Sequence, residues 1–189
     1  MIKRELRKVY QDKKNHLSHQ DLIQLDSLLL IQFQQLSLGD IKVVLSFWPI
    51  HEKCEVNMHL MVDYLSFLIP GLQLAFPVMN LSEHVFKPVL VDDDTHYLKN
   101  EYGIVEPVSG EEIPAYEIDV AFVPLLAFDT KGFRVGYGKG FYDRFLKSCR
   151  TNIIKIGFSY FEPEASIDDV NEFDVPLNIC ITPNKIYEF

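Results

Sequence analysis

The chain has little of what marks disulfide-stabilised, secreted or membrane-embedded proteins. It contains 3 cysteines in 189 residues, none in a Cys-x-x-Cys pair, so neither a disulfide framework nor a zinc site is indicated. The N-terminal residues Met1–Glu5 have no apolar segment of the kind found in secretory signals. Apolar runs such as Leu28–Ile31 are far shorter than the roughly 20 residues of a membrane-spanning helix. We therefore expect a cytoplasmic protein with no membrane partner.

Positive charge is also scarce. The 18 Lys and Arg residues are outnumbered by 27 Asp and Glu residues, which gives a net charge of −9. Because an acidic chain repels a phosphate backbone, we expect no nucleic-acid partner, although a local cluster of cations can still bind a small phosphate ligand. There is no internal repeat or low-complexity linker. The length predicts a single domain over residues 1–189, which we expect to be a monomer.

The pattern of apolar residues predicts alternating helices and strands. We expect helices at 2–15, from the capping box at 18–21 to about Gly39, at 56–69 and at 141–149. Strands are predicted at 41–47, 72–78, 118–124, 153–159 and 179–182, with a weaker candidate at 85–91. Residues 92–116 look like a long, partly irregular connection. The alternation predicts a Rossmann-like α/β fold, with three layers (α/β/α) and a mostly parallel sheet.

Residues 132–140, the glycine loop, follow the clearest strand and precede a helix. Glycine permits positive φ and a close approach of the backbone to a ligand, and the start of the next helix favours an anion. Arg134 and Lys139 add positive charge, and Asp143 adds a carboxylate in the first helical turn. Because parallel sheets bind ligands at the carboxyl ends of their strands, we predict that this loop opens onto a cleft there.

The loop pattern alone leaves other interpretations open. The spacing Gly136-x-Gly138-x-Gly140 matches neither a dinucleotide fingerprint nor a Walker A loop. A flexible loop before a capped helix would have the same local features. The chain has no Gly-x-Ser-x-Gly segment, and its 6 His residues show no metal-ligand spacing, so a Ser-His-Asp hydrolase is not supported.

The glycine loop and its surroundings resemble a known enzyme family. The run from Gly132 to Leu146 resembles the signature of 5-formyltetrahydrofolate cyclo-ligases, which reads approximately G-x-R-[LI]-G-x-G-[KG]-G-[YF]-Y-D-x-x-L. The resemblance continues in the family's order over nearly the whole chain, at Lys3–Arg7, Phe47–Asn57, Gly103–Pro107 and Phe173–Leu177. It implies ATP- and Mg²⁺-dependent cyclisation of 5-formyltetrahydrofolate to 5,10-methenyltetrahydrofolate, with release of ADP and phosphate. The implied scaffold is similar to that of sugar-phosphate isomerases and CoA transferases.

The resemblance also implies roles for individual residues. Lys139 and Arg134 would stabilise the transferring phosphoryl group as catalytic residues. Asp143 and Asp174 match the magnesium carboxylates of the family, and Mg²⁺ needs only one or two carboxylates besides phosphate oxygens and water. The implied folate contacts are Trp48, Glu55, Tyr137, Phe141 and Tyr142. The implied ATP contacts are Lys3, Arg4, Arg7, Arg134, Val135, Gly136, Tyr137, Gly138, Lys139, Gly140, Phe141 and Tyr142.

Each of these roles has a purely structural alternative. The basic N-terminal helix face would serve equally as a solvated surface, and a single Trp is often core packing. Asp143 would also complement its helix N-terminus, which adds only about 0.3–1 kcal/mol to stability. A non-catalytic folate- or nucleotide-binding protein, or another phosphate-ligand enzyme on the same scaffold, is the alternative function.

The chain departs from the family pattern at three places. Residues 50–54 form a slightly longer loop than usual, which leaves open whether Trp48 or Ile50 faces folate. Asn178 stands where the family often has Asp, which keeps an acceptor but removes a charge. Phe141 replaces a common Tyr and lacks its hydroxyl.

Overall fold

The computed structural model describes residues 1–101 and 103–189, and within them a seven-stranded sheet forms the centre of the molecule. The strand order is β11-β10-β9-β6-β1-β2-β3. The inner strands pair in parallel, whereas both edge strands, β3 and β11, are antiparallel to their neighbours. The predicted, mostly parallel sheet is therefore confirmed. The strands are β1 (Val43–Leu45), β2 (Gln73–Asn80), β3 (Val85–Val91), β6 (Val120–Val123), β9 (Ile154–Phe158), β10 (Ile179–Ile181) and β11 (Ile186–Glu188).

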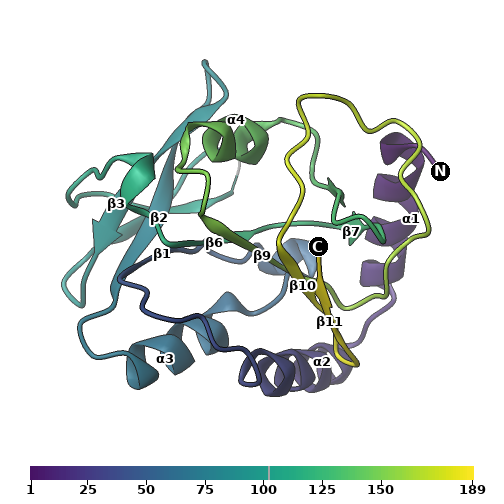
Figure 1. The fold of residues 1–189 in the computed structure, drawn as a ribbon, viewed down its shortest axis with the longest axis horizontal. Coiled ribbons are helices and arrows are strands. Elements are labelled where there is room, and N and C mark those ends of the chain that lie inside the picture. Colours follow the sequence, from purple (N-terminus) through teal and green to yellow (C-terminus); the bar gives the residue numbers. More distant parts are fainter. Residues whose placement is uncertain (102) are drawn as a thin grey trace.

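Helices cover both faces of this sheet (Figure 1). α2 (His19–Phe33) and α3 (Met58–Leu68) lie on one face, and α4 (Phe141–Ser148) lies on the other. α1 (Lys3–Asn15) stands beside the sheet, next to β7. Two short 3₁₀ helices, η1 (His51–Lys53) and η2 (Ala115–Glu117), lie in connections. The predicted three-layer α/β/α arrangement is confirmed. None of the helices in the described residues has the length and apolar character that a membrane span requires.

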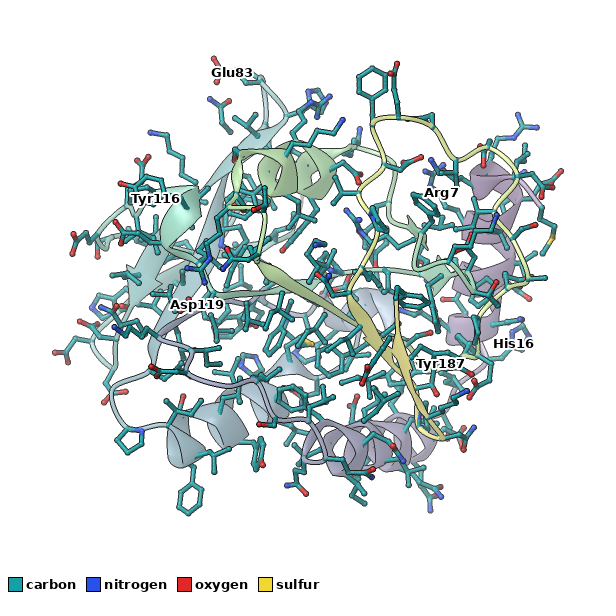
Figure 2. All side chains as sticks on the ribbon, viewed as in Figure 1. Arg7, His16, Glu83, Tyr116, Asp119 and Tyr187 are labelled. Carbon is teal, nitrogen blue, oxygen red and sulfur yellow. The ribbon has the colours of Figure 1, made fainter. Side chains whose placement is uncertain are left out.

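Alternate residues of the central strands supply two cores, because successive strand side chains point to opposite faces. Val43 and Leu45 of β1 pack on the α4 side with Phe145, whereas Val44 packs on the other side with α2 and α3. Figure 2 shows side chains filling the space between the sheet and α2. Burial on both faces explains why the strands read as continuous apolar runs. Each large apolar side chain buried in this way contributes about 1.5–3 kcal/mol.

A third cluster attaches α1 to the glycine loop. Leu6 and Tyr10 of α1 are buried against Leu126, Ala127 and Val135. The last two belong to a short antiparallel hairpin formed by β7 (Ala127–Phe128) and β8 (Arg134–Val135). The prediction that all of 132–140 is loop was therefore wrong at β8. The hairpin fixes the start of the glycine loop and, through α1, the basic N-terminal residues beside it.

Other differences from the prediction lie in short or tertiary-dependent elements. The connection 92–116 contains β4 (Tyr97–Lys99) and β5 (Val105–Pro107), which form their own two-stranded sheet; Tyr102 lies outside the described residues. α2 ends at Phe33 rather than near Gly39, because tighter turns follow it while Leu36 still packs on the core. The short strands β4 and β5 contain no apolar run that would mark them in the sequence.

Candidate active site

A cavity of about 680 Å³ opens where β1 and β6 end. Its walls come from α1, from the β1–α3 loop (residues 46–57), from the β2–β3 hairpin, from the glycine loop and from the segment after β9. This is the carboxyl end of the parallel strands, so the predicted cleft is confirmed. The predicted site residues that line it are Lys3, Arg4, Arg7, Trp48, Glu55, Arg134, Gly136, Tyr137, Gly138, Lys139, Gly140, Phe141, Tyr142, Asp143 and Asp174.

Val135 is the predicted site residue that does not line the cavity. Its side chain is fully buried with Leu6 and Tyr10 of α1. Its carbonyl accepts a hydrogen bond from the N–H of Leu126 at 2.8 Å. Val135 therefore anchors the start of the glycine loop, and a contact of its backbone with a nucleotide stays a prediction.

The glycine loop leaves backbone donors free. Gly138 and Gly140 have φ values of +93° and +72°, which other residues adopt only with strain. A Cβ atom at Gly138 would lie 3.1 Å from the guanidinium carbon of Arg7. In the described part of the chain, the N–H groups of residues 137–140 have no acceptor. Beside the N-terminus of α4, these donors form a surface suited to an anion.

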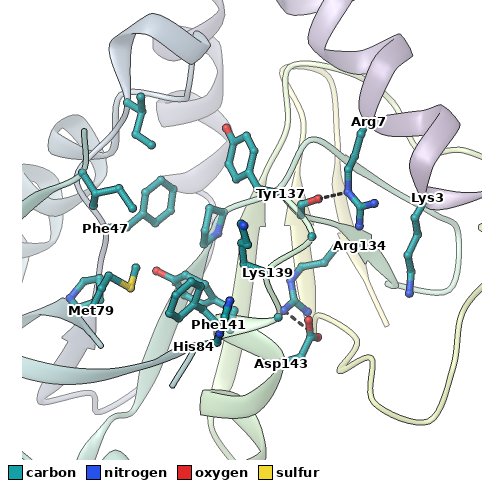
Figure 3. A pocket seen from close by; sticks show the side chains of 18 of the residues that line it. Lys3, Arg7, Phe47, Met79, His84, Arg134, Tyr137, Lys139, Phe141 and Asp143 are labelled. Carbon is teal, nitrogen blue, oxygen red and sulfur yellow. Dashed lines mark hydrogen bonds and ion pairs between the residues drawn. The ribbon is translucent and has the colours of Figure 1, made fainter. Parts of the chain in front are cut away.

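Cations surround the same loop (Figure 3). Lys139 is exposed and points into the cavity, with no ion-pair partner among the described residues. Arg7 donates from Nε to the carbonyl of Gly136 at 2.8 Å. Lys3 forms an ion pair with Asp174 at 2.5 Å. Arg7 of the N-terminal segment thus contacts the glycine loop, and Lys3 contacts Asp174, although these segments are far apart in sequence.

Arg134 is a buried cation rather than a mobile one. Its Nη1 donates to the carbonyl of Val175 at 2.5 Å, and its Nη2 lies 3.0 Å from Oδ1 of Asp143. Burial lowers the pKa of Arg134, and the neighbouring Asp143 opposes that shift. An arginine starts from a pKa above 12 and stays charged. Its position holds Asp143 at the cavity wall and joins it to the segment that carries Asp174.

Asp143 and Asp174 come from distant parts of the sequence and line the same cavity, which confirms their predicted convergence. Oδ1 of Asp143 accepts from the N–H of Val175, the residue next to Asp174, at 3.1 Å. Oδ2 of Asp174 accepts from Lys3 and from the N–H of Asn171 at 2.7 Å. Within the described residues, the other oxygen of each carboxylate has no hydrogen-bond donor.

This pair of carboxylates fits one kind of metal best. No group of three or more His, Cys, Asp or Glu side chains suited to a metal occurs in the described residues. A site with only two carboxylates suits Mg²⁺, which takes its remaining ligands from phosphate oxygens and water. The two carboxylate oxygens without donors are the atoms available for it.

The opposite side of the cavity is apolar and aromatic. Phe47, Trp48 and Ile50 of the β1–α3 loop line it. The Trp48 ring packs edge-on against His59 at 4.6 Å and tilts against Tyr97 at 4.8 Å. Trp48 is thus both packed and open to the cavity. Because Trp48 and Ile50 both line the cavity, both are placed for contact with a ligand.

Glu55 lies at the edge of this apolar surface with both oxygens engaged. Oε1 accepts from the Tyr137 hydroxyl at 2.5 Å, and Oε2 accepts from the N–H of Ile50 at 2.8 Å. Burial, together with the Glu55 charge, raises the pKa of Tyr137. The Lys53 ammonium lies 4.2 Å from the centre of the Tyr137 ring. Each carboxylate oxygen has a second lone pair, so Glu55 can still accept a hydrogen bond from a ligand while it stays bound within the protein.

Tyr142 and Phe141 start α4 at the floor of the cavity. The hydroxyl of Tyr142 is buried and has no hydrogen-bond partner among the described residues. Burial, followed by the Glu55 charge, raises the pKa of Tyr142. The Phe141 ring lies 5.7 Å from that of His84 on the β2–β3 hairpin. Tyr142 therefore supports the floor of the cavity, and its hydroxyl is enclosed by the protein rather than open to a ligand.

Sequence patterns missed part of the lining. Asp169 and Asn171 lie close to Asp174 in the acidic segment after β9, a proximity that could have indicated them. The hairpin residues carry no such signal, because only the fold brings them to the cavity. Asn178 lies outside the lining, and its side-chain oxygen accepts from the N–H of Lys155 at 3.0 Å. Ile50, the open alternative to Trp48, also lines the cavity. The lining residues not predicted as contacts are Phe47, Lys53, Pro77, Met79, Leu81, His84, Ile104, Pro124, Asp169 and Asn171.

Several curated proteins match part of the chain. It is 35% identical over 111 residues to the 5-formyltetrahydrofolate cyclo-ligase of Haemophilus influenzae, covering 51% of this chain and 59% of that protein. It is 36% identical over 78 residues to the Escherichia coli K12 protein of the same name, covering 41% and 43%. The chain thus spans about half the length of the curated relatives it matches.

Solved structures and a family model match much more of the chain. The 5,10-methenyltetrahydrofolate synthetase of Aquifex aeolicus superposes with a TM-score of 0.75 at 27% identity, covering 100% of this chain and 93% of that one. A 5,10-methenyltetrahydrofolate synthetase from Mycoplasma pneumoniae shares the fold, with a TM-score of 0.74 at 24% identity over 96% and 98% of the chains. Residues 2–183 match the model of the 5-formyltetrahydrofolate cyclo-ligase family, and the chain therefore belongs to that family.

Proposed function

We propose that this protein converts 5-formyltetrahydrofolate to 5,10-methenyltetrahydrofolate with ATP and Mg²⁺, releasing ADP and phosphate. One observation carries the proposal: a single cavity joins a phosphate-binding type of loop to an aromatic surface that ends in a carboxylate. The loop side offers the Lys139 ammonium and N–H groups that have no acceptor among the described residues. The other side offers Trp48 and Glu55.

The triphosphate lies along the glycine loop in this proposal. The N–H groups of residues 137–140 and the start of α4 bind phosphate oxygens. Lys139 contacts the γ-phosphate. Lys3, Arg4 and Arg7 lie on the α1 side of the nucleotide. Asp143 and Asp174 hold Mg²⁺ through the oxygens that have no donor among the described residues. When bound, the metal neutralises phosphate charge.

The folate lies across the aromatic side. Its flat pterin ring suits the Trp48 surface, because aromatic rings stack with a gain of about 0.5–1.5 kcal/mol beyond burial. Adjacent N–H donors of the pterin suit a carboxylate acceptor, which is Glu55. Glu55 can accept them through its remaining lone pairs while it keeps the hydrogen bond from the Tyr137 hydroxyl.

The reaction follows from this juxtaposition. The N5-formyl oxygen attacks the γ-phosphorus of ATP, and the bond to the ADP oxygen breaks. N10 then adds to the activated carbon, its proton is lost, and the carbon–oxygen bond breaks as phosphate leaves. The protein's contribution is to align the two substrates and to neutralise charge on the γ-phosphoryl group. Lys139 supplies a fixed cation for that charge.

The proposal extends to the setting of the enzyme. The three cysteines are free, which supports a reducing cytoplasm. The proposal also includes activity as a monomer.

The test is direct. The protein is mixed with 5-formyltetrahydrofolate and MgATP, and the absorbance band of 5,10-methenyltetrahydrofolate is followed. We expect product with ATP, none with ADP, and none when EDTA removes the metal. Binding of both ligands without product would instead support a non-catalytic binding protein.

A further inference from the structure

Arg144 lies on α4 outside the cavity lining, yet it contacts two of the cavity's rims. Its Nη1 donates to the carbonyl of Lys139 in the glycine loop at 3.0 Å. The same nitrogen donates to the carbonyl of His84, in the turn of the β2–β3 hairpin, at 3.0 Å. The guanidinium covers Gly140, where an added Cβ would lie 3.3 Å from Nη1. A solvated surface arginine has no need of two backbone acceptors.

The contact with Lys139 fixes the direction of a whole peptide group. Because a trans peptide is planar, its carbonyl and its N–H point in opposite directions. The carbonyl of Lys139 points at Arg144, outside the cavity, so the N–H of Gly140 points away from Arg144. That N–H has no acceptor among the described residues, and Gly140 itself lines the cavity.

The contact with His84 holds the β2–β3 hairpin, which forms the other rim of the cavity. His84 has a φ of +55°, an uncommon value for a residue other than glycine. It follows Glu83, which marks the projecting tip of the hairpin in Figure 2. Its ring also lies 5.7 Å from that of Phe141. Arg144 therefore ties the hairpin and the glycine loop together at the point where both line the cavity.

We propose that Arg144 is a positioning residue that aims the Gly140 N–H, and with it Lys139, at the phosphate chain of the nucleotide. This inference rests on the proposed function, because it assumes that the glycine loop receives ATP. An arginine suits the task, since its planar group presents several donors and is always charged. Arg144 is exposed, so its removal costs little stability.

The test compares Arg144→Ala and Arg144→Lys with the unmodified protein. Calorimetric titration gives the Kd of ATP without folate and the Kd of 5-formyltetrahydrofolate without ATP. We expect Arg144→Ala to raise the Kd of ATP about tenfold, because a misplaced binding group loses much of its effect. The Kd of 5-formyltetrahydrofolate should be unchanged. Arg144→Lys restores part of the loss. The control is Lys87→Ala, which removes another exposed cation, paired with Glu112 at 2.9 Å away from the cavity.

A second measurement tests the role of Arg144 separately from the proposed function. In amide NMR spectra without ligand, Arg144→Ala should shift and broaden the Gly140 signal, whereas Lys87→Ala should not. An unchanged Gly140 signal, or unchanged ATP affinity in Arg144→Ala, overturns the role of Arg144. A failure of the unmodified protein to bind ATP contradicts the proposed function instead.

Discussion

The glycine loop and the β1–α3 loop face each other across the cavity and differ in whether their polar groups are already hydrogen-bonded. In the glycine loop, the N–H groups of residues 137–140 and the Lys139 ammonium have no partner among the described residues. In the β1–α3 loop, Glu55 already accepts hydrogen bonds at both oxygens. The first loop can bind an anion without giving up any internal hydrogen bond. In the second loop, a ligand must share the Glu55 carboxylate with the Tyr137 hydroxyl and the Ile50 N–H.

This difference predicts different consequences of mutation. A group that is free in the protein and binds only the reacting phosphoryl group affects turnover, with little effect on folding. A group that is already bound within the protein affects ligand affinity and stability together, because its partner is left without a hydrogen bond. The following variants test that division, from the largest expected effect to the smallest.

Lys139→Met should have the largest effect on turnover. The change keeps the length of the side chain and removes a cation that stabilises charge in the transition state. We expect kcat to fall on the order of a hundredfold or more, corresponding to about 3 kcal/mol, with ATP affinity largely kept and Tm unchanged. Steady-state kinetics and thermal unfolding measure both. Lys131→Met, at an exposed residue just before the glycine loop and outside the lining, is the control; near-normal turnover in Lys139→Met would refute the role.

Neighbouring cations can take over part of the role of Lys139 and so reduce the loss of turnover in Lys139→Met. A double variant with Arg134 would damage the protein, because Arg134 is buried and bound to Asp143. Arg7→Met combined with Lys139→Met is the better second step, since Arg7 lies at the same loop and is only partly buried.

Asp143→Asn should weaken both metal-dependent activity and folding. The amide keeps an acceptor for Arg134 and Val175 but leaves the buried guanidinium with less negative charge beside it. We expect a higher Mg²⁺ concentration for half-maximal activity and a loss of about 1–3 kcal/mol in unfolding free energy. Loss of the Asp143 charge at the N-terminus of α4 would by itself lower the unfolding free energy by less. Magnesium titration and denaturant unfolding test this, with Asp12→Asn on the exposed face of α1 as control; unchanged Mg²⁺ dependence would exclude Asp143 as a ligand.

Glu55→Gln should affect folate binding selectively. The Gln oxygen can still accept from the Ile50 N–H, but its NH₂ group then faces the pterin donors and repels them. We expect the KM for 5-formyltetrahydrofolate to rise about tenfold to a hundredfold, with the KM for ATP unchanged. Tyr137→Phe removes the competing hydroxyl and should not weaken folate binding through Glu55. Glu52→Gln, an exposed neighbour paired with Lys99, controls for charge; equal rises in both KM values would argue against a folate contact.

His59→Gln should give the smallest effect, on the pH dependence of stability. Burial lowers the pKa of His59 beneath Trp48, with Asp63 opposing and His51 adding to the shift. The unfolded chain therefore binds more protons than the native one just below about pH 6.5, so His59 lowers stability as the pH falls through that range. Between about pH 7.5 and 5.5, the native protein should lose more unfolding free energy than His59→Gln. Because the ring is only partly buried, the difference should be small; a larger loss in the variant would reverse the assignment.

The sequence predicts the parts of the fold that have a strong local period. The apolar strands and the amphipathic helices place the central sheet, its parallel inner strands and the cleft. The β7–β8 hairpin and β11 could not be predicted, because no separate apolar run marks these short strands, which form through their tertiary partners. By contrast, β1 and β10, each three residues long, lie within apolar runs that were predicted as strands. The glycines that adopt positive φ can be recognised in the sequence, but the β7–β8 hairpin at the start of their loop cannot.

The candidate site divides in the same way. Lys139, Asp143 and the glycines belong to one contiguous motif, so their association was visible in the sequence. The burial of Arg134 against Asp143 and the use of both Glu55 oxygens depend on contacts between distant segments. His84 and Met79 reach the cavity only because the β2–β3 hairpin folds over it. A motif therefore identifies the residues but not which of their atoms remain available.

Isotope transfer tests most directly whether the two loops bring the formyl oxygen and the γ-phosphate together. 5-Formyltetrahydrofolate labelled with ¹⁸O in the formyl group is converted in one turnover with unlabelled MgATP, and the released phosphate is analysed by mass spectrometry. The proposed mechanism predicts that the label appears in inorganic phosphate, because the formyl oxygen leaves attached to phosphorus. Label recovered in water, with unlabelled phosphate, would show that ATP is cleaved without phosphoryl transfer to the folate and would contradict the mechanism.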